Sequence, residues 1–204
     1  MNLKFITTPI RKRLEALGWL KTREDFLRIF PKGSVGAELG VFQGKFSRAI
    51  LQIVQPRELH LIDPWWTVIG EYYGDWSRFH NGGELLSTRK AYEQALENVR
   101  QVDAQGVAVF HIQDDVECLK SFEDHYFDWV YVDSSHQYEH TWKELELLHR
   151  KVKPTGLIAG HDWKPDPSDV HHGVYRAVNE FCAKYGWKIT HLDRRHTQWC
   201  IQRH

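Results

Sequence analysis

The stretch Val35-Gly36-Ala37-Glu38-Leu39-Gly40-Val41-Phe42-Gln43-Gly44 decides the fold. A short apolar run ends in glycine, and residues 45–54 then carry apolar side chains at helical spacing, which predicts a buried strand followed at once by a helix. Glycines at 40 and 44 let the backbone turn tightly and approach a ligand closely. The G-x-x-x-G spacing differs from the G-x-G-x-x-G of pyrophosphate-binding turns and argues against NAD.

The same alternation of strand and helix continues to the end of the chain. Further strands are predicted at 59–62, 107–112, 127–132 and 157–160, with helices at 86–102, 115–122 and 138–151 and a last helix that includes Val174 and Phe181. Such alternation demands a parallel sheet with helices on both faces. The two final strands, 187–192 and 197–201, are joined by four residues, and so short a connection makes an antiparallel hairpin. We therefore expect an α/β, Rossmann-like, doubly wound sheet of seven strands.

Two segments are expected in the domain organisation. Residues 1–30 form an N-terminal helical leader, because apolar side chains recur near helical spacing up to Phe30 and Pro31-Lys32-Gly33 then breaks the pattern. Residues 31–204 form a single domain. The leader helix could pack on its own domain or on a second subunit, so a homo-oligomer stays open.

Composition excludes several functional classes. Lys plus Arg and Asp plus Glu both total 27, and this balance gives no support for a nucleic-acid partner. The three cysteines form no CxxC pair, so neither a disulfide framework nor a cysteine zinc site is indicated. No apolar run is long enough to span a membrane and the start lacks a signal-peptide core, so no membrane partner and a cytoplasmic location are expected.

Acidic residues follow the second and third predicted strands. Asp63 lies 23 positions after Gly40 (63 minus 40), where a carboxylate can accept hydrogen bonds from ribose hydroxyls. The alternative is an Asp-Pro turn or a helix cap. After the third strand, Asp114 or Asp115 could reach an adenine amino group or could equally cap the next helix.

Acidic residues and histidines also follow the fourth and fifth predicted strands. These strands end in Asp133-Ser134-Ser135-His136 and Gly160-His161-Asp162, and the two ends meet at one edge of the sheet. Asp133, Asp162 and His161 could hold a divalent ion. Oxygen ligands favour Mg²⁺ or Mn²⁺, whereas an imidazole favours Mn²⁺, Fe²⁺ or Zn²⁺.

Four of these motifs together resemble the class I methyltransferases that use S-adenosylmethionine, and more narrowly the macrocin-type and cephalosporin-type O-methyltransferases (methyltransferase domain family 24). The motifs are Ala37–Gly44, Leu61–Asp63, Val132–Glu139 and Gly156–Asp162. Residues 1–30 carry none of the resemblance.

The resemblance implies a role for each site residue. Glu38, Gly40, Phe42 and Gly44 would line the methionine part of S-adenosylmethionine, Asp63 would take the ribose, and Asp114 would lie near adenine. Asp133 and Asp162 would be ligands of Mg²⁺ or Mn²⁺, with Asp133 also helping to deprotonate the acceptor. The family's third ligand is usually acidic, and here His161 takes that place.

The resemblance also implies transfer to a small-molecule or sugar hydroxyl, although N-methylation stays open. His136, in the D-x-x-H position, is a candidate general base or a structural histidine. The aromatic segment after Asp63 could exclude water as a lid, and at least two of its rings should pack on neighbouring helices. Its six aromatic residues are Trp65, Trp66, Tyr72, Tyr73, Trp76 and Phe79.

Two other functional classes are weighed against this one. A metallohydrolase could be built from His136 and His140, which would share a helix face, but Glu139 does not fit the H-E-x-x-H order and His140 and His149 are better interpreted as surface residues. The other class is a module that binds the cofactor without catalysis.

Overall fold

The computed structural model describes residues 22–203, and its centre is one seven-stranded sheet. The strand order is β3-β2-β1-β4-β5-β7-β6. The strands are β1 (Val35–Leu39), β2 (Glu58–Asp63), β3 (Ala108–Ile112), β4 (Phe127–Val132), β5 (Val152–Gly160), β6 (Trp187–Asp193) and β7 (Gln198–Arg203). β1 to β5 run parallel, whereas β7 pairs antiparallel with both β5 and β6. The predicted doubly wound sheet with a terminal hairpin is confirmed.

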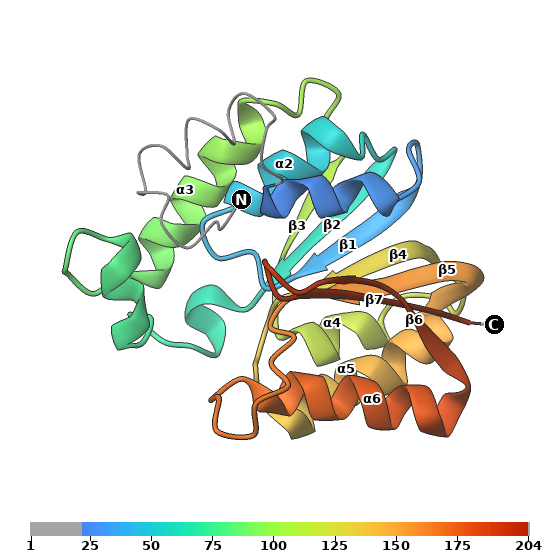
Figure 1. Cartoon of the computed structure of the whole chain (residues 1–204). Coiled ribbons are helices and arrows are strands. Elements are labelled where there is room, and N and C mark those ends of the chain that lie inside the picture. Colours follow the sequence, from blue (N-terminus) through green and yellow to red (C-terminus); the bar gives the residue numbers. More distant parts are fainter. Residues whose placement is uncertain (1–21, 204) are drawn as a thin grey trace, which may run out of the picture.

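Helices cover both faces of this sheet (Figure 1). α2 (Lys45–Ile53) and α3 (Thr88–Arg100) lie on one face, and α4 (Asp115–Lys120), α5 (Tyr138–Lys151) and α6 (His172–Tyr185) lie on the other. Apolar side chains of the strands alternate between two buried clusters: Leu59 and Leu61 join the α2/α3 side, and Ile62 joins the α4–α6 side. No helix within residues 22–203 is long and apolar enough to cross a membrane.

The first described residues pack on the α2/α3 face. They form a 3₁₀ helix, η2 (Arg23–Ile29), where Leu27 is fully buried and Phe30 follows as part of the same core. Residues 1–21 of the predicted helical leader lie outside the described residues, so the leader and the domain division stay predictions. Phe30 lies 4.8 Å from Trp129 of β4, ring centre to ring centre. The η2 segment is therefore held against the centre of the sheet.

The start of β5 is the strand boundary that differs most from the prediction. β5 begins at Val152 and not at Leu157, because Val152 already pairs with Phe127 of β4. The register shifts before Leu157 pairs with Trp129, so the strand bulges through Pro154-Thr155-Gly156. The predicted strand starts only at Leu157 because proline and glycine in a strand are typical of bulges as well as of turns.

Candidate functional site

The turn after β1 brings three strands together. Gly40 has φ +82°, and a Cβ there would collide with the backbone carbonyl of Asp133 at the end of β4. Gly44 begins α2, and a Cβ there would lie 2.8 Å from the Cα of Ala95 in α3. Gly40 thus permits the close approach of β1 and β4, whereas Gly44 permits the packing of α2 on α3. A contact of either glycine with the cofactor stays a prediction.

Asp63, at the end of β2, fixes the conformation of this turn. One carboxylate oxygen accepts the backbone N–H groups of Val41 (2.9 Å) and Phe42 (2.8 Å), and the other accepts that of Trp65 (2.8 Å). The side chain is buried, and burial raises the pKa of Asp63 even though the three hydrogen bonds lower it. Asp63 therefore shapes the site as well as being the candidate ribose ligand.

Glu38 lies on β1 and points to the α2/α3 face. The hydroxyl of Ser47 in α2 donates a hydrogen bond to its carboxyl group. Only 1% of the residue is exposed, and burial raises the pKa of Glu38 to about 8. The carboxyl group therefore holds a proton at neutral pH until a cation comes close to it.

The aromatic segment packs against Phe42 in the turn after β1. Phe42 has φ +53°, and its ring centre lies 4.9 Å from those of both Tyr73 and Trp76. Trp65 is fully buried, with its ring 5.0 Å from Tyr92 of α3. Trp66 also packs on Tyr92, so the expectation that at least two rings pack on a helix is confirmed. The segment holds two short 3₁₀ helices, η3 (Trp65–Thr67) and η4 (Asp75–His80), and Phe79 is 91% exposed.

Asp133, at the end of β4, pairs with Arg23 from the η2 segment. The Arg23 guanidinium also contacts the Tyr131 hydroxyl at 3.3 Å and lies 4.3 Å from the Phe46 ring centre. Burial by itself lowers the pKa of Arg23, but the charge of Asp133 and the Tyr131 contact outweigh burial and raise it. Sequence reasoning missed Arg23 because it precedes the recognised motifs, and no local pattern links it to a residue 110 positions later.

Asp162, after β5, is surrounded by three histidines. Its two oxygens lie 2.7 Å from Nε2 of His136, 3.2 Å from Nδ1 of His161 and 3.3 Å from Nδ1 of His171. The hydrogen bond and charge of Asp162 raise the pKa of His136 against the opposing effect of burial. The same contacts hold the pKa of Asp162 well below its usual value, also against burial. His171 was not among the ligands predicted from the sequence, because no motif or spacing relates it to Asp162.

The acidic residues after β3 lie in a separate cluster. Asp114 accepts the backbone N–H of Glu117 at 3.1 Å and so caps α4, which is the alternative that the sequence left open. Asp115 is buried and lies 2.8 Å from Nε2 of His140. The expectation that His140 is a surface residue holds only in part, because its side chain is 27% exposed and faces this carboxylate. Glu144, also fully buried, contacts Ser134 after β4, and burial raises its pKa.

His136 and His140 do not share a helix face. α5 begins at Tyr138, so His136 lies in the preceding loop and pairs with Asp162, while His140 pairs with Asp115. The pair of imidazoles on which the metallohydrolase interpretation depended is therefore split between two clusters.

Among the described residues, three groups of side chains could each hold a metal ion. Within each group, every residue offers one ligand atom, and these atoms lie within 4.8 Å of one another. The three groups are Asp133-His161-Asp162, His136-Asp162-His171 and Asp114-Asp115-His140. The first is the set predicted from the sequence, so the structure does bring those three residues together. The second adds two residues that were not predicted as ligands and shares Asp162 with the first.

The fold and the strand-end residues define a class of enzyme. A doubly wound sheet with a terminal hairpin, a glycine turn after β1 and carboxylates at the ends of β1, β2 and β4 define a class I methyltransferase dependent on S-adenosylmethionine. Residues 37–163 match the family described as "Methyltransferase domain", and the chain belongs to that family.

Solved structures agree with this assignment at the level of the fold. A SAM-dependent methyltransferase from Aquifex aeolicus is 19% identical, with 97% of this chain and 96% of that chain covered and a TM-score of 0.56. A protein from Corynebacterium glutamicum is 12% identical, with 95% and 87% covered and a TM-score of 0.65. Spermidine synthase from Thermotoga maritima also matches, at 13% identity, 86% and 53% covered and a TM-score of 0.52. No curated protein matches the chain in sequence.

Proposed function

We propose that this methyltransferase transfers a methyl group from S-adenosylmethionine to a hydroxyl group of a small molecule or sugar. The observation that carries the proposal is the convergence of Asp133, His136, His161 and Asp162 at the ends of β4 and β5, next to the glycine turn. A neutral hydroxyl is a poor nucleophile, and such a group of bases and ligands can activate it. An amine acceptor needs less help of this kind.

The cofactor would lie across the ends of β1 and β2. Glu38 would bind the ammonium group of the methionine part. Asp63 would accept hydrogen bonds from the ribose hydroxyls, with the lone pairs that the backbone N–H groups leave free. Asp114 stays a candidate for a contact with adenine because of its position after β3, although its carboxylate already caps α4. The exposed rings of Trp76 and Phe79 would help to exclude water from the bound cofactor.

The transfer itself is an in-line displacement. The acceptor oxygen forms a bond to the methyl carbon while the bond from that carbon to the sulfonium sulfur breaks, and S-adenosylhomocysteine leaves. Asp133 accepts the hydroxyl proton, and its pairing with Arg23 fixes the orientation of the carboxylate. His136, whose Nε2 faces Asp162, is the alternative proton acceptor only when that nitrogen binds no ion.

The residues around Asp162 also suit a divalent ion. Carboxylate and imidazole donors converge within 4.8 Å, as the ligands of a single ion do. Asp162 and His161 would hold the ion in the predicted set, with Asp133 turned partly toward Arg23. Such an ion would lower the pKa of a bound hydroxyl and so make the oxygen a better nucleophile.

Calorimetric titration with S-adenosylhomocysteine tests the proposal first. We expect micromolar affinity, followed by release of S-adenosylhomocysteine when the protein meets S-adenosylmethionine and a panel of catechols, sugars and other hydroxyl compounds. A matched panel of amines is the control. Turnover on amines alone would contradict O-methylation, and cofactor binding without turnover on either panel would favour a non-catalytic module.

Cofactor binding is expected to release protons from Glu38. With its pKa near 8, Glu38 is mostly protonated at pH 7, and the ammonium group of the cofactor favours the carboxylate. Binding at pH 7 should therefore release close to one proton, and the release should vanish above about pH 9, where Glu38 is already ionised. Calorimetry in phosphate and in Tris measures this number. Proton release that persists in the Glu38→Gln variant would assign it to another group.

A further inference from the structure

We propose that His136, Asp162 and His171 form a two-histidine, one-carboxylate site for a transition-metal ion. This inference rests on the proposed function, because the ion would lie where the acceptor hydroxyl is activated. It differs from the predicted ligand set in taking His171 and leaving out Asp133. His171 lies beyond residues 37–163, so it comes from this chain's own loop and not from the part shared with the family.

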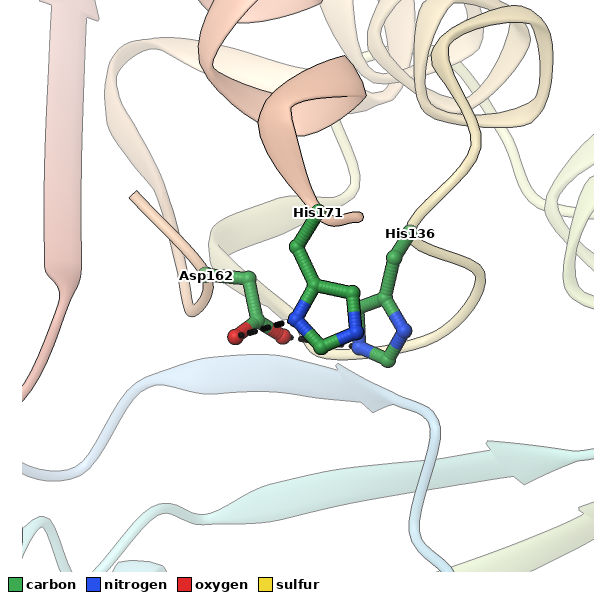
Figure 2. A group of neighbouring side chains, drawn as sticks. All are labelled: His136, Asp162 and His171. Atoms are coloured by element: carbon green, nitrogen blue, oxygen red, sulfur yellow. Dashed lines mark ion pairs between the residues drawn. The ribbon is translucent and has the colours of Figure 1, made fainter. Parts of the chain in front are cut away.

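The geometry of the three side chains supports one shared ion. Figure 2 shows both imidazole rings on one side of the Asp162 carboxylate, with ring nitrogens turned toward it. Nε2 of His136 lies 2.7 Å from one carboxylate oxygen and Nδ1 of His171 lies 3.3 Å from the other. Ligand atoms of a six-coordinate ion lie about 3 Å apart when each bond is about 2.1 Å. Small shifts of the side chains would therefore admit the ion.

The local backbone is built to bring these three residues together. A Cβ at Gly173 would lie 2.7 Å from the backbone nitrogen of Tyr138 and 2.9 Å from the carbonyl oxygen of His136, so glycine allows the start of α6 to touch the loop before α5. Asp162 is only 6% exposed and has φ +58°, a conformation that costs energy in a residue with a Cβ. Strain of this kind persists where the surrounding structure holds it for a function.

The buried, negatively charged carboxylate of Asp162 favours the binding of a cation. The ion pairs of this carboxylate within residues 22–203 are all with histidines, which carry charge only when protonated. The ring centres of His136 and His171 are 4.1 Å apart, and one nitrogen of each ring lies within 4.8 Å of the other and of a carboxylate oxygen of Asp162. A divalent ion satisfies the buried carboxylate and uses the neutral nitrogens as ligands at the same time.

Asp133 is less suited to the same ion. Its carboxylate already pairs with the guanidinium of Arg23, and one of its oxygens lies 3.6 Å from Nδ1 of His161. His161 in turn contacts the Thr197 hydroxyl through Nε2, at 3.3 Å. Asp133 and His161 would therefore orient the neighbouring side chains of the site without binding the ion. The remaining positions on the ion would then be open to water or to an acceptor oxygen.

The donor set predicts which ions bind. Imidazole nitrogen favours Co²⁺, Fe²⁺, Mn²⁺ and Zn²⁺, whereas Mg²⁺ prefers oxygen ligands in a regular octahedron. Affinity should rise from Mn²⁺ to Co²⁺, and Mg²⁺ should bind at least about 100-fold more weakly than Co²⁺.

The test adds Co²⁺ to the full chain after treatment with a chelator, without S-adenosylmethionine. We expect one Co²⁺ per chain and two strongly shifted, exchangeable imidazole N–H signals in the proton NMR spectrum. His136→Ala and His171→Ala should each remove one signal and weaken Co²⁺ binding about 100-fold or more. His191→Ala, at an exposed histidine of β6, is the matched control and should bind like the wild type.

Two results would overturn the inference. One is a set of shifted signals that survives in His171→Ala and disappears in Asp133→Asn, which would place the ion in the predicted set. The other is the absence of Co²⁺ binding, or Mg²⁺ binding as tight as that of Co²⁺. Titration of the same samples with S-adenosylhomocysteine keeps the two proposals separate, because the proposed cofactor site at the ends of β1 and β2 does not include His171.

Discussion

Asp133→Asn is expected to slow methyl transfer about 1000-fold while changing the affinity for S-adenosylhomocysteine by no more than about threefold. The reason is the position of Asp133 at the end of β4, beside the Asp162 group, where it would accept the proton of the acceptor hydroxyl. An amide keeps the shape of the side chain but cannot take that proton. Single-turnover formation of S-adenosylhomocysteine, with an acceptor found in the hydroxyl panel, measures the rate.

The pairing of Asp133 with Arg23 requires a control. Asp133→Asn leaves the half-buried guanidinium without its partner, so stability should fall by about 2 kcal/mol. The double variant Arg23→Gln/Asp133→Asn removes both charges and should regain stability without regaining the rate. A double variant that regained the rate would contradict the role of Asp133 as proton acceptor.

Asp63→Ala is expected to weaken the binding of S-adenosylhomocysteine at least about 100-fold. Two hydrogen bonds from ribose hydroxyls to a carboxylate are lost, each contributing about 1.5–3 kcal/mol. The variant also leaves the backbone N–H groups of Val41, Phe42 and Trp65 without an acceptor, which should lower stability by about 3 kcal/mol. Calorimetry and thermal unfolding followed by circular dichroism measure the two effects.

Asp63→Asn separates the effect on binding from that on the fold. The amide oxygen can still accept from the turn after β1, so this variant should be more stable than Asp63→Ala. Its affinity should remain low, because the amide has one acceptor oxygen where the carboxylate has two. Tight cofactor binding by a folded Asp63→Ala protein would show that the ribose binds elsewhere.

The strand-end residues could be found in the sequence because they obey local rules. An apolar run that stops at Glu38-Leu39-Gly40, at Asp63 or at Asp133 marks the end of a buried strand, and parallel strands bring these ends to one edge. The terminal hairpin followed from the four residues between its strands. Family membership could be predicted from the sequence as well, because these local motifs occur in the right order along the chain.

The partners of those residues could be found only in the tertiary structure. Arg23 reaches Asp133 from the η2 segment, and His171 reaches Asp162 from the start of α6, through contacts that no spacing in the chain encodes. The cap that Asp114 forms on α4 is likewise visible only in the structure, and its contact with adenine stays a prediction.

The sequence by itself thus determined the class of fold and the order of the strands' functional ends, because hydrophobic periodicity and turn chemistry are local, and the resemblance of its motifs to a known family indicated the cofactor. Only the tertiary structure decided how the charged side chains pair. Asp133 pairs with Arg23, whereas Asp162 faces His136 and His171, and Nδ1 of His161 lies near both carboxylates, 3.6 Å from Asp133 and 3.2 Å from Asp162. The physical reason is that a side chain's partners depend on which elements pack over each face of the sheet, and packing is a property of the whole domain.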